Sequence, residues 1–353
     1  MNNLININKY GFSEEYLSKN LLDSNLEPAR ILSQEKGFYR IITNKGEKLA
    51  EVSGKFRFQA DVSSEYPAVG DFVLVNWNEL GNSAIIESLL PRKSAFVRKA
   101  VGEVQQEQVV AANIDTVFLC MSLNNNFNLR RLERFITSAW DSGAMPVVVL
   151  TKSDLCDDLE QKLTEVSSIA FGVDVLVTNS IDENGYEEIL PFISEGKTIA
   201  FIGSSGVGKS TIINHLLGKE YLKTGEICNN DKGRHTTTRR ELFLLPSGGM
   251  VIDTPGMREF GMWDNDKGIE RTFEDIEELS DQCKFRNCTH TKEPGCAIQK
   301  ALETGELELK RWKSYQKLKA ENNYVEDKEG YMLTKGKKEK EISKLIKKMQ
   351  IRV

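Results

Sequence analysis

Short apolar runs separated by turn residues characterise the chain from Gly37 to about Leu90. Runs of about four to eight residues bounded by glycine and asparagine are typical of strands in small all-β domains. The pattern therefore predicts a small β-barrel, for which the OB-fold is a common architecture. The predicted strands are FYRIIT, KLAEVSG, DFVLVNW and AIIESLL.

Aromatic and basic side chains of this barrel would form an RNA-binding surface if they face outward. The alternative is that the aromatic rings fill the barrel while the basic groups only face water. The residues in question are Phe38, Arg40, Lys55, Arg57 and Phe58.

Beyond about residue 107 the pattern changes to an alternation of apolar strands and amphipathic helices. Repeated strand and helix units predict a mainly parallel sheet with helices on both faces. The predicted strands are DTVFLCMSL, PVVVL, VDVLV and TIAFI, followed by a hairpin of ELFLLP and GMVID. The predicted helices are LRRLERFITSAWDSG, residues 159–170, residues 186–193 and KSTIINHLLG.

The two ends of the chain differ from this middle part. Residues 1 to about 35 carry only a weak helical pattern, whereas helical patterns resume after about Arg271 and continue to the end. We therefore predict a multidomain protein with an OB-like β-barrel, an α/β domain and an α-helical domain. The predicted ranges are 1–36 for an N-terminal extension, 37–94 for the barrel with its exit linker at 91–94, 95–265 for the α/β domain, 266–325 for the helical domain and 326–353 for a basic tail.

A phosphate-binding loop follows the strand TIAFI and opens the next helix, which is the context that the motif G-x-x-x-x-G-K-[ST] requires. Its amides and the helix N-terminus would point at the phosphates. Lys209 would neutralise the β- and γ-phosphates, and Ser210 would bind Mg²⁺. The alternative is a chance turn of glycine and serine. The residues expected at the nucleotide are Gly203, Ser204, Ser205, Gly206, Val207, Gly208, Lys209, Ser210 and Thr211.

The tetrapeptide Thr151-Lys152-Ser153-Asp154 follows the strand PVVVL and is therefore expected at the carboxyl edge of the sheet, where nucleotides bind. The Asp154 carboxylate can accept hydrogen bonds from N1–H and the 2-amino group of guanine, whereas adenine presents an acceptor at N1. A site built on such bonds rejects the wrong base strongly. Lys152 would lay its aliphatic stem over the base. The alternative is a simple helix cap.

Two further segments are expected at the same nucleotide. Asn179 and Ser180 follow the strand VDVLV and would pack on the other side of the base. Asp253 and Gly256 match a D-x-x-G element after the strand GMVID. Asp253 would reach Mg²⁺ through water, and the amide of Gly256 would sense the γ-phosphate.

A polar, threonine-rich loop at residues 232–240 is expected to be switch I. Thr237 or Thr238 would complete the Mg²⁺ shell, and Thr237 is our choice. Met257 stands where many GTPases have a glutamine, and a thioether cannot orient the attacking water. We therefore expect slow unassisted hydrolysis, with a partner moving His235 or a group of its own into place. The alternative for His235 is a loop residue without a catalytic role.

The sequence C283-x4-C288-x-H290-x5-C296 offers three thiolates and one imidazole. Cys283, Cys288, His290 and Cys296 would form a complete tetrahedral set for one structural zinc ion, with no open position for catalysis. The alternative is a group of free buried thiols. Trp312, on the helix that follows, is expected to be a packing anchor.

Composition adds three constraints. The start of the chain lacks the pattern of a secretory signal, and no apolar run approaches the roughly 18 residues that span a bilayer, so we expect a cytoplasmic protein without a membrane partner. The formal charge of -5 argues against a uniformly basic nucleic-acid binder. The tail from Tyr331 to Val353, with seven Lys and one Arg against two Glu, would contact a polyanion such as RNA or simply remain solvated. A monomer is the default expectation.

The motif order is reversed relative to ordinary GTPases, since the base-reading T-K-S-D precedes the phosphate loop. Cutting a set of parallel strands at one connection and rejoining it at another, a circular permutation, preserves the site. This order, with a barrel before it and a cysteine cluster after it, resembles the ribosome small subunit-dependent GTPases, the RsgA family. The resemblance covers about residues 37–320 and is carried by GSSGVGKS, GRHTTT, DTPG and CKFRNCTHTKEPGC. Thr151, where asparagine is commoner in GTPases, is a departure.

The resemblance implies an OB-fold, a circularly permuted GTPase domain and a zinc domain that together engage the 30S subunit and its 16S rRNA late in assembly. It also implies GTP hydrolysis that the subunit stimulates and that drives release, with a role for His235. Two other functions stay open from the residues alone. One is an RNA-binding assembly scaffold with little turnover, which Met257 favours; the other is an ATP-driven enzyme, which Asp154 disfavours.

Overall fold

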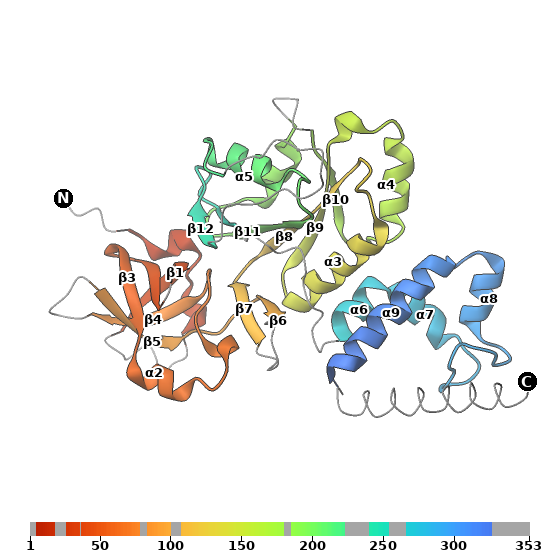
Figure 1. Ribbon diagram of the computed structural model, residues 1–353, viewed down its shortest axis with the longest axis horizontal. Coiled ribbons are helices and arrows are strands. Elements are labelled where there is room, and N and C mark those ends of the chain that lie inside the picture. The colour runs from red at the N-terminus through yellow and green to blue at the C-terminus, as the bar shows by residue number, and fades with distance from the viewer. Residues whose placement is uncertain are drawn as a thin grey trace, which may run out of the picture. The chain divides into compact units, whose positions relative to one another are not determined.

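Two compact units make up the chain in the computed structural model, Met1–Gly261 and Met262–Val353 (Figure 1). The structure describes residues 5–17, 26–35, 37–77, 83–99, 107–179, 185–222, 240–253 and 266–326. Among the described residues, no helix combines the length and the apolar character needed to cross a membrane.

The first unit begins with a closed five-stranded barrel. Its strands pair in the order β1-β2-β3-β5-β4, and β4 pairs back onto β1. Only the β3–β5 pair is parallel. Alternate residues point inward, so the interior is lined by small and branched side chains such as Ala29, Ile31, Ile41 and Val73. The predicted OB-like barrel is therefore confirmed. Its strands are β1 (Glu27–Glu35), β2 (Phe38–Thr43), β3 (Gly46–Val52), β4 (Phe72–Trp77) and β5 (Ser83–Leu89).

The structure corrects the expectation of a helical extension before residue 37. Residues Glu27–Glu35 form β1, the strand that closes the barrel. Upstream, two short 3-10 turns, η1 (Ile7–Tyr10) and η2 (Glu14–Tyr16), bury apolar side chains against the rest of the unit. The prediction missed β1 because polar residues interrupt its apolar pattern.

The exposed side chains of the barrel include both aromatic candidates from the sequence. Phe38 is 47% exposed, and Phe58, on helix α2 (Gly54–Gln59), is 90% exposed. Phe56 of the same helix packs into the barrel core instead. The idea that Phe38 and Phe58 fill the barrel is therefore wrong. A 3-10 turn, η3 (Ser63–Glu65), leads from α2 towards β4.

A separate two-stranded sheet follows the barrel, formed by β6 (Ala95–Lys99) and β7 (Glu107–Ala112). After the barrel and its linker, the sequence predicts the next strands only from about residue 107. Strand structure thus begins earlier than expected, immediately after the linker at residues 91–94.

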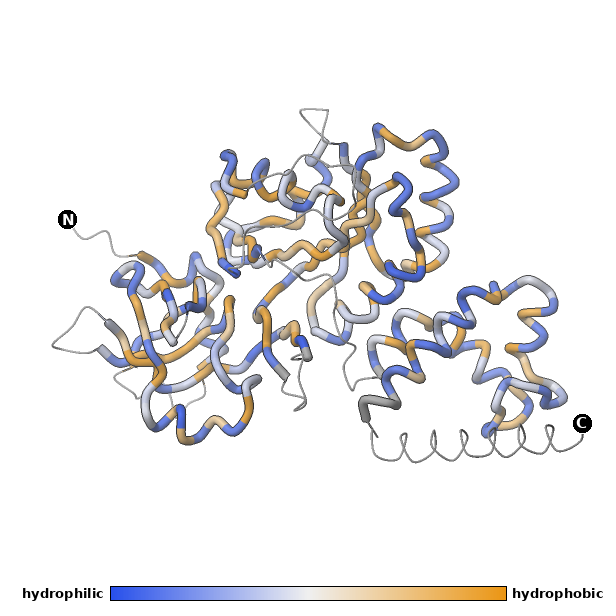
Figure 2. The backbone as a smooth tube through the Cα atoms, in the orientation of Figure 1, coloured by the Kyte–Doolittle hydropathy of each residue, from blue (hydrophilic) through white to orange (hydrophobic). Residues whose placement is uncertain are grey.

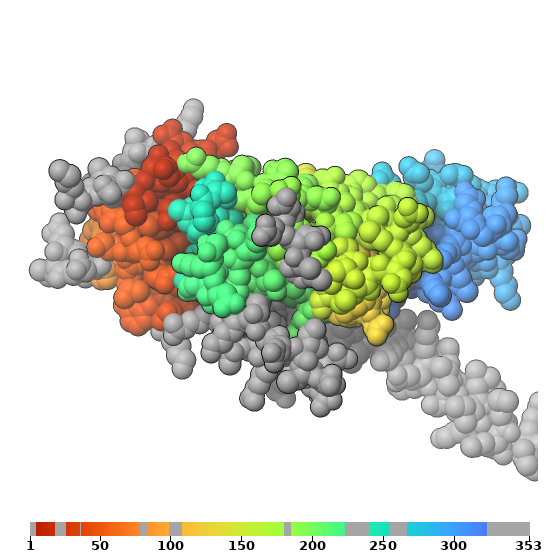
Figure 3. Space-filling model, turned by 90° about the horizontal axis from the view of Figure 1, so that it is seen from above, coloured from red at the N-terminus to blue at the C-terminus, as the bar shows by residue number. Residues whose placement is uncertain are grey.

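The second part of this unit is the predicted parallel sheet. Its strands lie in the order β10-β9-β8-β11-β13-β12, with only β12 antiparallel to its neighbour. β12 also pairs with β1, so the barrel and this sheet form one continuous 11-stranded sheet. Figure 3 shows the segment around β12, in teal, against the first strands of the barrel, in red and orange. The strands are β8 (Thr116–Ser122), β9 (Met145–Thr151), β10 (Asp174–Val177), β11 (Thr198–Gly203), β12 (Glu241–Leu244) and β13 (Met250–Asp253).

Helices cover both faces of the sheet, as predicted. Val117, Leu119 and Met121 of β8 pack in one cluster with α3 (Leu129–Ser142) and α4 (Leu159–Ser167). Phe118 and Cys120 pack in the other with α5 (Lys209–Leu217) and the 3-10 helix η5 (Glu187–Phe192). The strands are buried on both faces, which is why their sequences are continuously apolar (Figure 2).

The second unit is helical, as expected. Trp312, Tyr315, Phe273 and Cys296 belong to its core. Trp312 is 6% exposed, which confirms its packing role. The helices are α6 (Asp266–Thr272), α7 (Glu274–Asp281), α8 (Ala297–Thr304) and α9 (Leu309–Glu326).

Candidate guanine nucleotide site and metal centre

The predicted nucleotide residues follow the carboxyl ends of neighbouring parallel strands. The phosphate loop follows β11, the T-K-S-D segment follows β9, and Asn179 follows β10. Asp253 is the last residue of β13, which pairs in parallel with β11. Carboxyl ends of parallel strands meet at one edge of a sheet, so the structure brings these segments together at the expected binding edge.

The phosphate loop depends on two glycines. A Cβ on Gly203 would lie 2.5 Å from the carbonyl oxygen of Cys120, so no larger residue fits against β8. Gly208 has a φ of 101° and is the N-cap of α5, a conformation that favours glycine. The Lys209 ammonium donates to the carbonyl oxygens of Gly203 and Ser204, each at 2.7 Å. The lysine thus lies across the mouth of the loop, where phosphates would bind.

A side-chain hydrogen bond joins the T-K-S-D segment to the phosphate loop. The Thr151 hydroxyl donates to the carbonyl oxygen of Val207 at 2.6 Å, and Thr151 is only 4% exposed. The sequence suggests that a threonine here departs from the usual asparagine, and the structure shows what the hydroxyl does instead. It links the end of β9 to the phosphate loop.

The backbone of the T-K-S-D segment turns sharply at Lys152, whose φ of 59° lies in the left-handed region. Such a conformation is uncommon for a residue other than glycine and is typical of functional turns. Ser153 then donates its backbone N–H and its hydroxyl to the carbonyl of Thr178, which anchors this turn to the segment after β10. Asp154 is exposed at the start of the 3-10 turn η4 (Ser153–Leu155), accessible to a ligand.

Asp253 lies near the positive charge of Lys209. Burial raises the pKa of Asp253 to about 6, and the Lys209 cation opposes this shift. A buried carboxylate at the end of β13 favours a cationic partner, which fits its expected role near Mg²⁺.

Two residues at this site escaped the sequence prediction. Asn126, in the loop after β8, donates from its side-chain amide to the Ser204 hydroxyl at 2.7 Å. The Arg131 guanidinium, on the first turn of α3, donates to the Asn126 side-chain oxygen at 2.7 Å. The polar run NNNFN directly after a buried strand was the available signal, because β8 ends at the same sheet edge as β9 and β11.

Part of the predicted set lies outside the described residues. These positions are Ser180, His235, Thr237, Thr238, Gly256 and Met257.

The second unit brings all four predicted metal ligands together. The ligand atoms of Cys283, Cys288, His290 and Cys296 lie within 4.8 Å of one another. Cys283 and Cys296 have their sulfur atoms 3.9 Å apart, and the His290 Nδ1 is 3.5 and 3.6 Å from those sulfurs. The edge of a tetrahedron with zinc–sulfur bonds is about 3.8 Å. The donor set and its size therefore fit a tetrahedral metal ion.

The surroundings of His290 prepare it as a ligand through Nδ1. Its Nε2 lies 3.1 Å from the Ser280 hydroxyl, so the other ring nitrogen has its own partner. Burial lowers the pKa of His290, which favours the neutral imidazole that metals bind. Glu293, which the sequence prediction also missed, accepts the backbone N–H groups of Thr289 and Thr291, each at 2.9 Å, and so shapes the loop that carries His290.

The surroundings of Cys283 also favour the form of the side chain that binds metal. Burial opposes its ionisation, but hydrogen bonds from the backbone N–H groups of Ala297 and Ile298 and from the side chains of Cys288 and Cys296 together lower the pKa of Cys283. The amide of Ala297 lies 3.3 Å from the sulfur. Because the thiolate is the form that binds metal, these amides favour the liganded state.

Taken with the strand order, this site defines a P-loop nucleotide-binding domain of circularly permuted type, between a barrel and a helical unit that can hold a metal ion. The sequence model of the RsgA GTPase family matches residues 89–263. A model described as ABC transporter matches residues 191–351, a range that contains the phosphate loop common to ATP- and GTP-binding proteins.

Similar proteins extend the match over the whole chain. The small ribosomal subunit biogenesis GTPase RsgA 2 of Lactiplantibacillus plantarum is 47% identical over 91% of this chain and 90% of its own length. RsgA 1 of Oceanobacillus iheyensis is 44% identical over 98% of this chain and 99% of its own. The chain belongs to the RsgA family of GTPases.

Solved structures agree in fold. YjeQ from Thermotoga maritima has a TM-score of 0.62 and 26% identity, covering 83% of this chain and 97% of YjeQ. YloQ, described as a circularly permuted GTPase, has a TM-score of 0.60 and 25% identity, covering 86% of this chain and 96% of YloQ.

The Thr151 hydrogen bond gives a first prediction. Thr151→Val keeps the branched shape but leaves the Val207 carbonyl without its donor, so we expect the affinity for GDP and GTP to fall about tenfold. Thr151→Asn, which restores an N–H donor, should recover most of the loss. Calorimetric titration of both variants measures the effect, and equal affinities of Thr151→Val and wild type would contradict the role of this bond.

Proposed function

We propose that this protein is a GTP hydrolase that acts with the 30S ribosomal subunit late in its maturation. The convergence of the phosphate loop and the T-K-S-D segment, joined by the Thr151–Val207 hydrogen bond, is the observation that supports guanine nucleotide binding. Membership of the RsgA family, whose relatives are named small ribosomal subunit biogenesis GTPases, supports the assignment to the subunit. We further propose that it works as a cytoplasmic monomer.

The nucleotide would be held from two ends. Backbone amides of the phosphate loop and Lys209 would bind the phosphates, while Asp154 would read the guanine edge and Lys152 would cover its face. Ser210 and Asp253 would hold Mg²⁺, the second through water, and Thr237 would join them in the GTP state. Mg²⁺ would neutralise charge that develops on the phosphates.

Hydrolysis requires a group that orients water, and Met257 cannot supply it. We propose that the 30S subunit stimulates turnover by positioning His235 or a group of its own, and that hydrolysis is coupled to release. Exposed Phe38 and Phe58, with basic residues beside them, are candidates for contact with 16S rRNA.

The metal of the second unit is proposed to be zinc, with a structural role. Three thiolates and one imidazole are soft ligands that select zinc, and the set leaves no position for substrate.

Stimulation by the subunit is the central test. GTP hydrolysis should rise by a large factor, on the order of a hundredfold or more, when 30S subunits are added, because the subunit supplies what Met257 lacks. The stimulation should weaken steeply as salt rises, because contacts to phosphates release counterions. Equal and negligible rates with and without subunits would instead favour a scaffold with little turnover.

Base selection gives a second test. In Asp154→Asn the side-chain amide can donate to the 2-carbonyl of xanthine, whereas it loses one acceptor for guanine. We expect preference to shift from GTP to xanthosine triphosphate by about a hundredfold or more. Asp157→Asn, an exposed neighbour, is the matched control and should keep GTP preference. Tight ATP binding that survives Asp154→Asn would overturn guanine reading.

Metal removal gives a third test. Zinc analysis should find a single ion per chain, and chelation or Cys288→Ser should unfold the second unit, with loss of helical circular dichroism, because the metal supplies folding free energy. Cys156→Ser, a cysteine outside the cluster, should leave the metal content unchanged. Retention of the helical signal after complete metal removal would show that the unit folds without the ion.

A further inference from the structure

A buried arginine joins the barrel to the nucleotide-binding sheet. Arg30, on β1, is 1% exposed, and its guanidinium lies 4.7 Å from the ring centre of Phe72. It donates to groups from five other segments of the unit. The acceptors are the carbonyl oxygens of Tyr10 at 2.6 Å, Gly70 at 3.1 Å and Asn113 at 3.2 Å, the Thr198 hydroxyl at 2.8 Å and the Met250 sulfur at 3.0 Å.

Two of these acceptors lead directly to the nucleotide site. Thr198 is the first residue of β11, and Met250 is the first residue of β13. The two residues are paired in the parallel register of these strands. The other end of β11 is Gly203 of the phosphate loop, and the other end of β13 is Asp253. Arg30 therefore contacts the paired first residues of β11 and β13. The last residues of these two strands would lie at the phosphates and at Mg²⁺.

Other contacts close to Arg30 also attach the barrel to β12 and β7. Ser33 of β1 pairs with Glu241 of β12, and Arg40 of β2 forms an ion pair with the same glutamate. A Cβ on Gly70 would lie 2.2 Å from the carbonyl oxygen of Ala112, so the barrel backbone touches the end of β7 directly. These contacts leave little room for the barrel to move without moving β11 and β13.

The hydrogen bonds of Arg30 depend on the positions of β11 and β13 relative to the barrel. None of its five acceptors is a carboxylate, so neutral oxygens and one sulfur solvate the buried charge. Burial lowers the pKa of Arg30 to about 10, which leaves it charged at neutral pH. A buried cation without its acceptors is costly. A shift of either strand start relative to the barrel would therefore be resisted.

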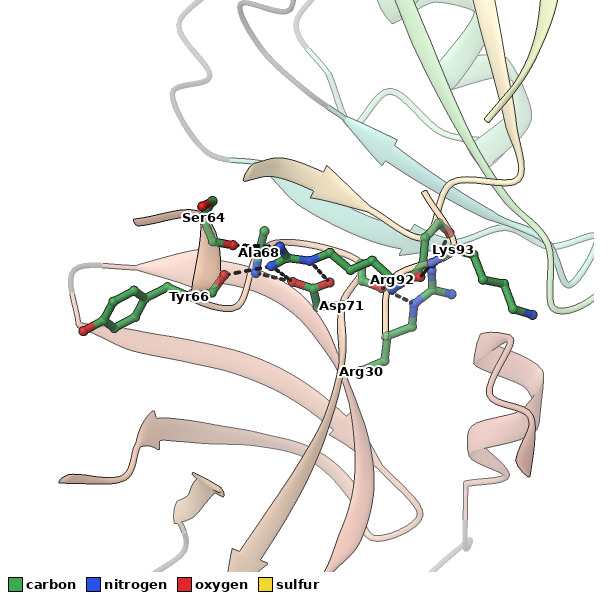
Figure 4. A network of polar contacts seen from close by, with 9 residues as sticks. Arg30, Ser64, Tyr66, Ala68, Asp71, Arg92 and Lys93 are labelled. Atoms are coloured by element: carbon green, nitrogen blue, oxygen red, sulfur yellow. Dashed lines mark hydrogen bonds and ion pairs between the residues drawn. The ribbon is translucent and has the colours of Figure 1, made fainter. Parts of the chain in front are cut away.

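A second arginine nearby, Arg92, is only partly buried and provides a contrast. Arg92 makes a two-pronged ion pair with Asp71, at 2.8 and 2.7 Å, and donates to the carbonyls of Ser64 and Tyr66 (Figure 4). Asp71 is fully buried and also accepts from the amide of Ala68. All of these partners belong to the connection between α2 and β4, so Arg92 stabilises the barrel and its exit linker without contacting β11 or β13 in these bonds.

We propose that Arg30 is a positioning residue that couples the barrel to the nucleotide site. It holds the starts of β11 and β13 in the register that presents the phosphate loop and Asp253, so nucleotide binding stiffens the barrel, and contact at the barrel surface changes hydrolysis. The inference rests on the proposed function in taking guanine nucleotide as the ligand.

Hydrogen exchange of the full chain, with and without a non-hydrolysable GTP analogue, tests the coupling. In the wild type the analogue should slow exchange in β1 and β4 by about threefold or more, because local opening of the barrel is linked to nucleotide binding. Thr198→Val removes the hydroxyl acceptor on β11 at nearly constant shape, and Met250→Leu removes the sulfur on β13. Both variants should bind the analogue normally but lose most of the slowing. Arg92→Lys is the matched control and should keep it.

Thr198→Val and Met250→Leu remove acceptors on two different strands, so the experiment still tests the inference if one of the two variants folds poorly. Loss of the nucleotide effect in either folded acceptor variant, with retention in Arg92→Lys, supports the role of Arg30. A wild type without any nucleotide effect on the barrel overturns it, as does an effect that survives in both acceptor variants or disappears equally in Arg92→Lys.

Kinetics with 30S subunits separate this inference from the proposed function. Thr198→Val should keep the unstimulated rate and the KM for GTP, whereas stimulation by subunits should fall about tenfold. The double variant Arg30→Lys, Thr198→Val should lose no more than Arg30→Lys alone, because Arg30→Lys already disrupts the contact with Thr198. Equal stimulation of Thr198→Val and wild type overturns the inference. If the wild type is not stimulated at all, the proposed function fails, and the exchange experiment still decides the coupling.

Discussion

The hydrogen bond from Thr151 to Val207 connects two loops that lie 56 residues apart in the chain. In the proposed site the T-K-S-D segment would read guanine and the phosphate loop would hold the phosphates, so the two loops would have to keep a fixed separation. The parallel sheet supplies this separation coarsely, because β9 and β11 flank β8 and end at the same edge. The Thr151 hydroxyl adds a direct hydrogen bond between the two loops. Ser153 extends the connection to the segment after β10.

The same constraint explains why the reversed motif order is tolerated. Each loop needs only the end of its own strand, and no step of binding depends on which strand the chain visits first. Permutation changes what the strands are attached to. Here β13 carries Asp253 at its end, and the next described element, α6, already belongs to the second unit. The start of β13 contacts Arg30 of the barrel. The strand that would report on the γ-phosphate is thus linked to a different domain at each end.

The sequence predicted those parts of the structure that depend on local pattern. β8, β9 and β11 are buried on both faces and read as continuous apolar runs, and the zinc-type ligands lie within 14 residues of one another. β1 was missed because its sequence, EPARILSQE, places Arg30, Ser33 and Gln34 in the strand. Arg30 is buried only because distant segments supply its acceptors, and such contacts leave no periodicity to read. Asn126 was missed for the same reason, since its partner Ser204 is 78 residues away.

In the second unit the candidate metal ligands are also part of the hydrophobic core. Its described helices form a small cluster in which Cys296 is both a candidate ligand and a buried core residue at 5% exposure. Trp312 stacks on Tyr315 at 5.4 Å and meets the edge of the His290 ring at 5.7 Å. The same residues therefore set both the ligand geometry and the core packing. Units of this size usually need a metal ion, disulfides or a partner in addition to their hydrophobic core to be stable. A metal ion held by these four residues would order the loop between α7 and α8, and Trp312 of α9 lies against the ring of His290 in that loop. A change in the metal would consequently reach the whole unit.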